Sequence, residues 1–343
     1  MRRLAAIAFS ALALPAAASA AGDSWAQPQI EAVVAAGLLA DSSETFKPQR
    51  PLTQRALGGA LETLSLSRTE IVDYRYRVVV PGRAVTIREL DAALVAFLDL
   101  GDAARAVTTA LRAAGLEPKT GVGTETVARL LGLRFNHPAA SDELEPALDQ
   151  PATRAEAAFS LARALALSGW EQEEIRTATA ALVLPELTDL QRQVLRRAVS
   201  FVGTPYVWGG LSEAPQKLWN GRKLPGGFDC SGFVWRVFKL EPFPGASPLA
   251  TVLRGRTTYE MAGEVPAAQR IRKPENLQPG DLIFQGARGA KSKPAQVDHA
   301  GIYLGGGWFV HSSGNGTTLH PFDGWYRERF AWARRPLREA GLG

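Results

Sequence analysis

The spacing of apolar residues changes along the chain, and this change limits the folds that it can adopt. Before about residue 200, as between residues 30 and 38, apolar side chains recur three and four positions apart, which is typical of amphipathic helices. After residue 277 they gather in short runs at 281–284, 300–304 and 308–310, which are typical of strands. Because helices precede strands, we expect an α+β domain over residues 188–338, preceded in sequence by an all-α domain.

The N-terminus has the features of an export signal. Arg2 and Arg3 precede an apolar run, and small residues follow as far as Ala20, so we expect residues 1–20 to be a cleaved signal peptide. The run is too short to span a bilayer, and no later stretch approaches the ~20 apolar residues that a spanning helix needs. The sequence therefore predicts a protein that is secreted or held at the cell wall, without a membrane span.

Residues 21–167 contain degenerate repeats of a helix-loop-helix unit. Thr53 is a plausible N-cap of one helix, and a similar helix start recurs one hundred residues later at Thr153. A third start, at Thr86, has the same form. Internal repeats usually stack into a shared core, so we expect one helical domain here. An acidic connector follows at 168–187.

Charge and composition exclude several kinds of site. From Thr188 onward the chain has 21 Lys and Arg against 12 Asp and Glu, which suits an anionic polymer as partner. For an exported protein this partner is wall material rather than nucleic acid. The chain has a single cysteine and no His-Glu-x-x-His motif, so we expect no metal site. No phosphate-binding glycine loop is present, and we expect no cofactor.

The single cysteine, Cys230, has two interpretations. It is either a small buried apolar residue or a catalytic nucleophile. It follows Asp229 and directly precedes an apolar helical run. The N-terminus of a helix favours negative charge, so this position would lower the pKa of a thiol.

Two histidines flank a predicted hairpin turn. A three-residue turn centred on Gly306 pairs residue 301 with residue 311, which places His299 and His311 on one face of the sheet. Such a pair provides a base and a group that orients it. His320 is the rival for the second role, and His137 is expected to be a loop residue of the repeat half.

Four ordered motifs in residues 188–336 resemble the NlpC/p-sixty family of bacterial cell-wall cysteine peptidases. The motifs are residues 203–210, 228–234, 277–284 and 299–311. The resemblance implies a papain-like α+β fold in which Cys230 is the nucleophile, His299 the general base and His311 the third catalytic residue. It also implies that Tyr206 and the backbone N–H of Cys230 stabilise the oxyanion. Asp229, Ser231 and Trp208 are then expected to bind the stem peptide.

The N-terminal half resembles the S-layer homology domain of bacterial surface proteins. The resemblance rests on a Trp-Ala start at Trp25 and on the helix start Thr153-Arg154-Ala155-Glu156. The copy at residues 53–56 departs from that motif. The resemblance implies binding of wall polysaccharide, and the alternative is a helical spacer without a ligand.

These features together predict a secreted peptidoglycan endopeptidase. The family resemblance implies cleavage between D-glutamate and a diamino acid of the stem peptide, through an acyl-enzyme. Two alternatives stay open: an amidase or acyltransferase acting on another wall amide, and a wall-binding surface protein without catalysis. Loops at 210–226, 254–259 and 286–296 depart from the family pattern; they rim the expected cleft and bear on which peptide it accepts.

Overall fold

The computed structural model describes most of the chain, in two compact units. The described residues are 24–66, 74–135, 145–218, 220–221, 223–240, 243–246 and 248–342. The expected signal peptide and His137 lie outside them. One unit comprises Thr108–Lys119 and Ala181–Gly343, and the other comprises residues 24–107 with Thr120–Ala180. Within the described part of the chain, no helix has both the length and the apolar character to cross a membrane.

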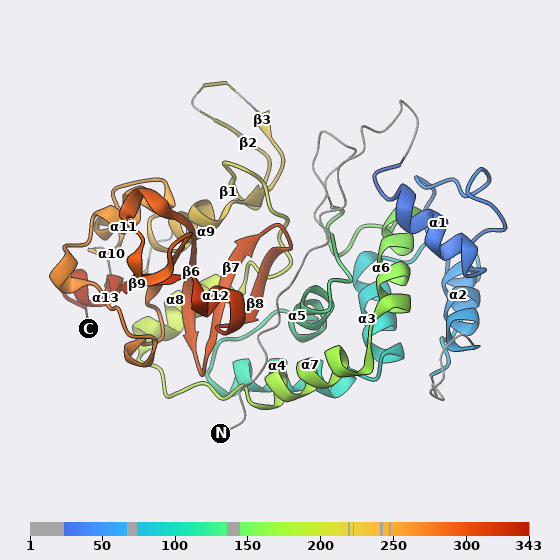
Figure 1. The fold of residues 1–343 in the computed structure, drawn as a ribbon, viewed down its shortest axis with the longest axis horizontal. Coiled ribbons are helices and arrows are strands. Elements are labelled where there is room, and N and C mark those ends of the chain that lie inside the picture. The colour runs from blue at the N-terminus through green and yellow to red at the C-terminus, as the bar shows by residue number, and fades with distance from the viewer. Residues whose placement is uncertain are drawn as a thin grey trace. The chain divides into compact units, whose positions relative to one another are not determined.

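The N-terminal half is built from helices (Figure 1). They are α1 (Gln27–Ala35), α2 (Gln54–Leu66), α3 (Ile87–Phe97), α4 (Gly101–Ala113), α5 (Val122–Leu130), α6 (Arg154–Ala166) and α7 (Gly169–Ala180). The connector expected at 168–187 thus contains a helix, α7. The three predicted helix starts are confirmed, because Thr53, Thr86 and Thr153 each accept a hydrogen bond from a backbone N–H in the first turn.

A ring of main-chain hydrogen bonds joins the three helix starts. Leu52 N–H donates to the Ala152 carbonyl, Ala152 N–H to Val85, and Val85 N–H back to Leu52, each at 2.8 Å. All three residues are completely buried. Each segment therefore satisfies the buried polar groups of the next, and segments far apart in sequence meet with threefold regularity. This is the shared core that the repeats predict.

An ionic cluster lies buried in the same unit. Glu145 accepts hydrogen bonds from Nη2 of both Arg129 and Arg134, each at 2.6 Å, and all three side chains are almost inaccessible to solvent. Burial alone would raise the pKa of Glu145, but the two guanidinium groups hold it below its ordinary value. The cluster also contains Asp91, Glu125 and Glu156.

The C-terminal unit contains a five-stranded antiparallel sheet with strand order β8-β7-β6-β5-β9. Its strands are β5 (Leu282–Gly286), β6 (Val297–Gly305), β7 (Trp308–Ser313), β8 (Gly316–Pro321) and β9 (Phe330–Arg334). The α+β organisation is thus confirmed: helices between residues 189 and 263 precede the antiparallel sheet in sequence. The two strands β8 and β9 were not predicted from the sequence.

Helices and short hairpins complete this unit. The longer helices are α8 (Asp189–Val199) and α9 (Cys230–Phe238), and shorter ones are α10 (Leu249–Val252), α11 (Thr258–Gly263), α12 (Gly324–Glu328) and α13 (Pro336–Glu339). The long loop at 210–226 forms two-residue strands: β1 (Leu211–Ser212) pairs with β4 (Gly227–Phe228), and β2 (Gln216–Lys217) with β3 (Lys223–Leu224). Short 3₁₀ turns lie at η1 (Ala267–Gln269), η2 (Pro274–Asn276), η3 (Gly289–Lys291) and η4 (Pro294–Gln296).

The turn between β6 and β7 differs slightly from the predicted one. Gly301 pairs with His311, as expected, but Gly305 pairs with Trp308 after a register shift. The turn itself is therefore the two residues Gly306 and Gly307, both with positive φ, the geometry of a tight hairpin. The segment before α8 packs on this turn, because a Cβ on Gly306 would lie 2.2 Å from the Val183 carbonyl oxygen.

Candidate active site

Cys230 is the first residue of α9. The preceding residue, Asp229, is the N-cap, and its carboxylate accepts a hydrogen bond from the backbone N–H of Gly232. The prediction that this cysteine begins a helix is therefore confirmed. The helix is anchored by Phe233, Val234 and Val237, which are completely buried, so the position of the thiol is fixed by the core of the domain.

The Cys230 thiol lies beside β6, near the end of its pairing with β7. The pairing between these strands ends at Gly301 and His311, and the Cys230 sulfur lies 4.0 Å from the carbonyl oxygen of Asp298. The Ala300 N–H, on the other side of His299, also hydrogen-bonds the sulfur and favours the thiolate. The nucleophile candidate thus contacts the main chain on both sides of His299.

The two histidines of the hairpin are hydrogen-bonded to each other. Nε2 of His299 lies 2.9 Å from Nδ1 of His311, and the two rings are almost perpendicular, at 89°. His311 is completely buried, whereas His299 is partly exposed. The register of the hairpin therefore brings His299 and His311 together, as predicted, and the main chain beside His299 contacts the Cys230 sulfur.

Both reactive groups are neutral at physiological pH. Burial, followed by the Asp229 carboxylate, raises the pKa of the Cys230 thiol to about 12. Burial lowers the pKa of His299 to about 4 and that of His311 well below its ordinary value. The expected lowering of the thiol pKa by the helix start is thus wrong for the resting site, because burial and Asp229 outweigh the hydrogen bonds that favour the thiolate.

Tyr206 lies beside the nucleophile. It forms a bridge with Phe228, two residues before the cysteine. Burial, Cys230 and Asp229, in that order, raise the pKa of its hydroxyl, so the hydroxyl is protonated and lies within electrostatic range of both groups. Trp208 follows in the same loop with 75% of its surface exposed.

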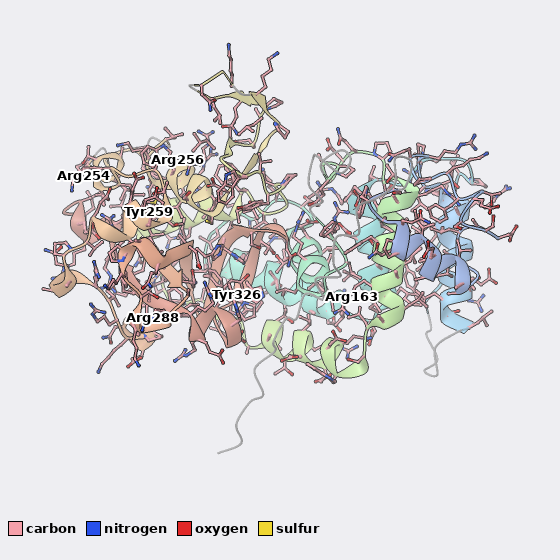
Figure 2. All side chains as sticks on the ribbon, turned by 45° about the horizontal axis from the view of Figure 1, so that its top comes forward. Arg163, Arg254, Arg256, Tyr259, Arg288 and Tyr326 are labelled. Atoms are coloured by element: carbon pink, nitrogen blue, oxygen red, sulfur yellow. The ribbon has the colours of Figure 1, made fainter. Side chains whose placement is uncertain are left out.

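Asp229 connects the start of α9 to the loop that carries Tyr206. Its Oδ2 accepts from the Gly209 N–H at 2.9 Å, and its Oδ1 accepts from the Ser231 hydroxyl at 2.9 Å. Arg256 contacts both residues, at 2.7 Å from the Ser231 hydroxyl and 3.4 Å from Asp229. Arg256 (Figure 2) was assigned no role from the sequence, since only the tertiary fold brings it to this pair.

Tyr326 is a second residue that the sequence did not reveal. It comes from α12 (Figure 2), and its ring packs on His311 and His320, with centroid distances of 4.9 and 4.7 Å. His320 lies on β8, not after a loop, and its Nδ1 lies 2.8 Å from the Pro321 carbonyl oxygen. His299 is thus hydrogen-bonded to His311, while the ring of His320 lies edge-on to that of His311, with 5.9 Å between centroids.

The described residues contain no group of three or more His, Cys, Asp or Glu side chains arranged to hold a metal ion. The site itself offers a thiol, an imidazole pair and a phenolic hydroxyl. These groups suit nucleophilic attack on a carbonyl carbon.

Comparisons with known proteins find matches to the C-terminal part of this chain. Residues 203–335 match the NlpC/P60 family. Peptidoglycan endopeptidase RipB of Mycobacterium tuberculosis is 36% identical over 123 residues, which are 36% of this chain and 43% of RipB. Gamma-D-glutamyl-L-lysine dipeptidyl-peptidase of Bacillus subtilis is 28% identical over 126 residues, 37% of this chain and 33% of that protein.

The solved structure of RipB covers 47% of this chain and 67% of its own, with 28% identity and a TM-score of 0.31. The chain spans less than half the length of the two curated relatives. The matched region contains Tyr206, Cys230 and the histidine pair. Residues 203–335 are an NlpC/P60 family domain.

Proposed function

We propose that this protein is a peptidoglycan endopeptidase that uses Cys230 as its nucleophile. The observation that carries the proposal is the hydrogen bond of 2.9 Å between His299 and His311, beside a thiol at a helix start. The same domain is similar to proteins named peptidoglycan endopeptidases. A nucleophile, a base and a group that orients the base are the parts that acyl transfer requires.

The proposed reaction begins with a neutral thiol. As the Cys230 sulfur attacks the carbonyl carbon of the stem peptide, the thiol proton passes to Nδ1 of His299, because Nε2 is engaged by His311. The oxyanion that forms is stabilised by the Cys230 N–H and the Tyr206 hydroxyl. His299 then gives the proton to the leaving amine, and a thioester remains. Water, deprotonated by His299, attacks the thioester and releases the acid and the thiol.

His311 acts in this scheme as a neutral acceptor. Because burial keeps its pKa well below the ordinary value, its Nδ1 lone pair is available for the Nε2–H of His299. When His299 takes the thiol proton, this hydrogen bond becomes one to a charged donor and strengthens. The base is thus stabilised most at the point where it carries positive charge.

Substrate recognition is proposed on both sides of Cys230. Trp208 offers an exposed ring, and Asp229 with Ser231 would face the amino end of a stem peptide. Because Asp229 and Ser231 are only 8% and 6% exposed, we propose that their main action is to hold the loop of Tyr206 and Trp208 in place. The bond proposed for cleavage is that between D-glutamate and the diamino acid, and the name of the Bacillus subtilis relative supports it.

The setting of the enzyme is part of the proposal. A signal peptide cut after Ala20 would deliver it to the cell wall, and the N-terminal repeats would bind wall polysaccharide. N-terminal sequencing of protein recovered from the medium and wall fractions tests the first point. A mature chain that still begins at Met1 in those fractions would contradict it.

Defined muropeptides test the central proposal. The mature protein is expected to release fragments cut after D-glutamate, read by mass spectrometry, and Cys230→Ala should release none. Products cut at another wall amide would favour an amidase or acyltransferase instead. If Cys230→Ala protein digested muropeptides as well as the wild type, catalysis through this thiol would be ruled out.

A further inference from the structure

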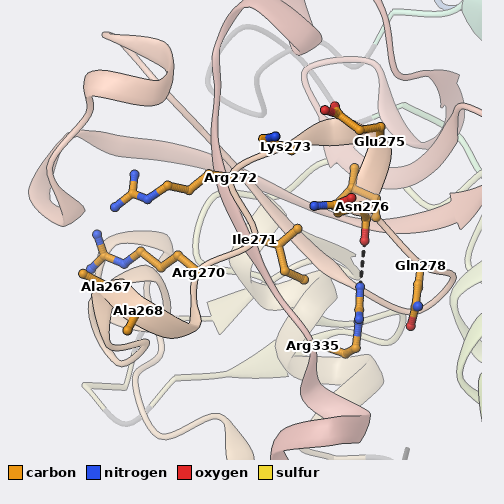
Figure 3. Close-up of a pocket in the computed structure, with 11 residues that line it drawn as sticks. Ala267, Ala268, Arg270, Ile271, Arg272, Lys273, Glu275, Asn276, Gln278 and Arg335 are labelled. Carbon is orange, nitrogen blue, oxygen red and sulfur yellow. Dashed lines mark hydrogen bonds between the residues drawn. The ribbon is translucent and has the colours of Figure 1, made fainter.

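An open pocket of about 770 Å³ lies in the C-terminal unit, lined by residues 267–268, 270–273 and 275–278 and by Arg335 (Figure 3). Its charged lining consists of Arg270, Arg272, Lys273 and Arg335 with one acid, Glu275. We call it the basic pocket. None of the residues proposed to act in catalysis or substrate binding lines it.

Two of its arginines are held in place by the fold. Arg335 forms a two-pronged ion pair with Asp281, at 2.8 and 2.9 Å, and also donates to the Asn276 carbonyl at 2.8 Å. Arg270 donates through Nε to the Val265 carbonyl at 3.0 Å, and its guanidinium lies 4.1 Å above the ring of Trp332. These contacts hold both side chains in place, on opposite sides of the pocket (Figure 3).

The positive charges of Arg270, Arg272 and Lys273 have no ion-pair partner within the described residues. Arg329, Arg334 and Arg335 each form an ion pair. Among the described residues no carboxylate comes within 4.0 Å of Arg270, Arg272 or Lys273. Figure 3 shows the guanidinium groups of Arg270 and Arg272 on the same side of the pocket. Like charges repel, so an anion bound between these two side chains would be stabilised.

We propose that the basic pocket binds an oxyanion, a phosphate or carboxylate group carried by an anionic polymer. Guanidinium groups match the geometry of both anions with paired N–H donors. A volume of about 770 Å³ far exceeds one such ion, which favours a group on a larger molecule. The site goes beyond the proposed endopeptidase function and does not depend on it.

Small probes test the site directly on the full mature chain. Isothermal titration with inorganic pyrophosphate and with citrate is expected to show saturable binding that weakens with salt. Arg272→Gln should weaken it at least tenfold; Arg272 is exposed, so the fold is spared. Arg338→Gln removes an equally exposed charge outside the pocket and should change affinity less than twofold. Equal losses in both variants, or none in Arg272→Gln, would overturn the proposal.

Purified walls distinguish the sources of the anion. In a Cys230→Ala background, Arg272→Gln should reduce retention on untreated walls. If phosphate is the ligand, removing phosphodiester-linked polymers with hydrofluoric acid abolishes the difference in retention between the two proteins. If carboxylate is the ligand, amidation of the wall carboxyl groups abolishes the difference instead. A difference that survives both treatments contradicts the proposal. In the active protein, the Arg272→Gln variant should cleave a soluble stem peptide as fast as the wild type. The proposal for the basic pocket and the proposal of peptidase activity can therefore be refuted independently of each other.

Discussion

Replacing His311 gives the sharpest test of the catalytic arrangement. Its Nδ1 lies 2.9 Å from Nε2 of His299, and its ring is completely buried. His311→Ala removes the acceptor, whereas His311→Asn keeps an acceptor oxygen in a smaller side chain. We expect kcat on a soluble stem peptide to fall in both variants, and to fall further in the alanine variant.

The size of the effect follows from the charge on His299 during the reaction. Hydrogen bonds to charged groups contribute about 1.5–3 kcal/mol, and this one reaches that strength only when His299 is protonated. Since about 1.4 kcal/mol corresponds to a tenfold change in rate, His311→Ala should lower kcat by roughly 10- to 150-fold. KM should change little, because the hydrogen bond is no stronger in the bound ground state.

His320→Ala is the matched control. Its ring also packs on Tyr326, at 4.7 Å between centroids, but its Nδ1 is engaged by Pro321 rather than by His299. We expect kcat to change less than threefold. Initial rates across substrate concentrations, with thermal unfolding of each variant, give the comparison. A larger loss in His320→Ala than in His311→Ala, at equal stability, would refute the assignment of the third residue.

Three further predictions follow from the structure. Cys230→Ser should lower activity by at least about 10³-fold while leaving the free energy of unfolding within about 0.5 kcal/mol of wild type, measured by urea titration and muropeptide release. Because burial lowers the pKa of His299 to about 4, the base stays neutral on acidification until pH falls through about 4; an acid limb of kcat/KM near pH 6.5 would contradict this. Glu145→Gln removes the negative charge of a carboxylate that two buried arginines share. The helical unit should therefore lose about 3–5 kcal/mol of stability, measured by urea unfolding of the full chain. A loss below about 1 kcal/mol would contradict this prediction.

Local signals predicted the parts of this protein that depend on local chemistry. The helix starts at Thr53, Thr86 and Thr153 were identified from an N-cap and the apolar spacing behind it. The pairing of Gly301 with His311 followed from strand alternation and a glycine turn. In each case the determining contacts lie within about ten residues of one another in sequence.

Features that depend on distant contacts could not be predicted in the same way. Strand β8 reads Gly-Thr-Thr-Leu-His-Pro, which has little apolar character, and it becomes a strand because β7 offers it a partner. Arg256 and Tyr326 reach the site only through tertiary packing. The pKa of Cys230 depends first on burial, and burial cannot be known before the fold.

The packing of residues 181–187 on the hairpin turn has a practical consequence for dividing this protein. A Cβ on Gly305 would lie 2.6 Å from Cδ of Pro185, and one on Gly306 2.2 Å from the Val183 carbonyl oxygen. This segment therefore covers the turn of the hairpin whose strands carry His299 and His311. A fragment begun at Thr188 would keep every candidate catalytic residue and yet uncover that turn. A C-terminal fragment is therefore better begun at Ala181 than at Thr188, because the longer stretch of the compact unit begins at Ala181.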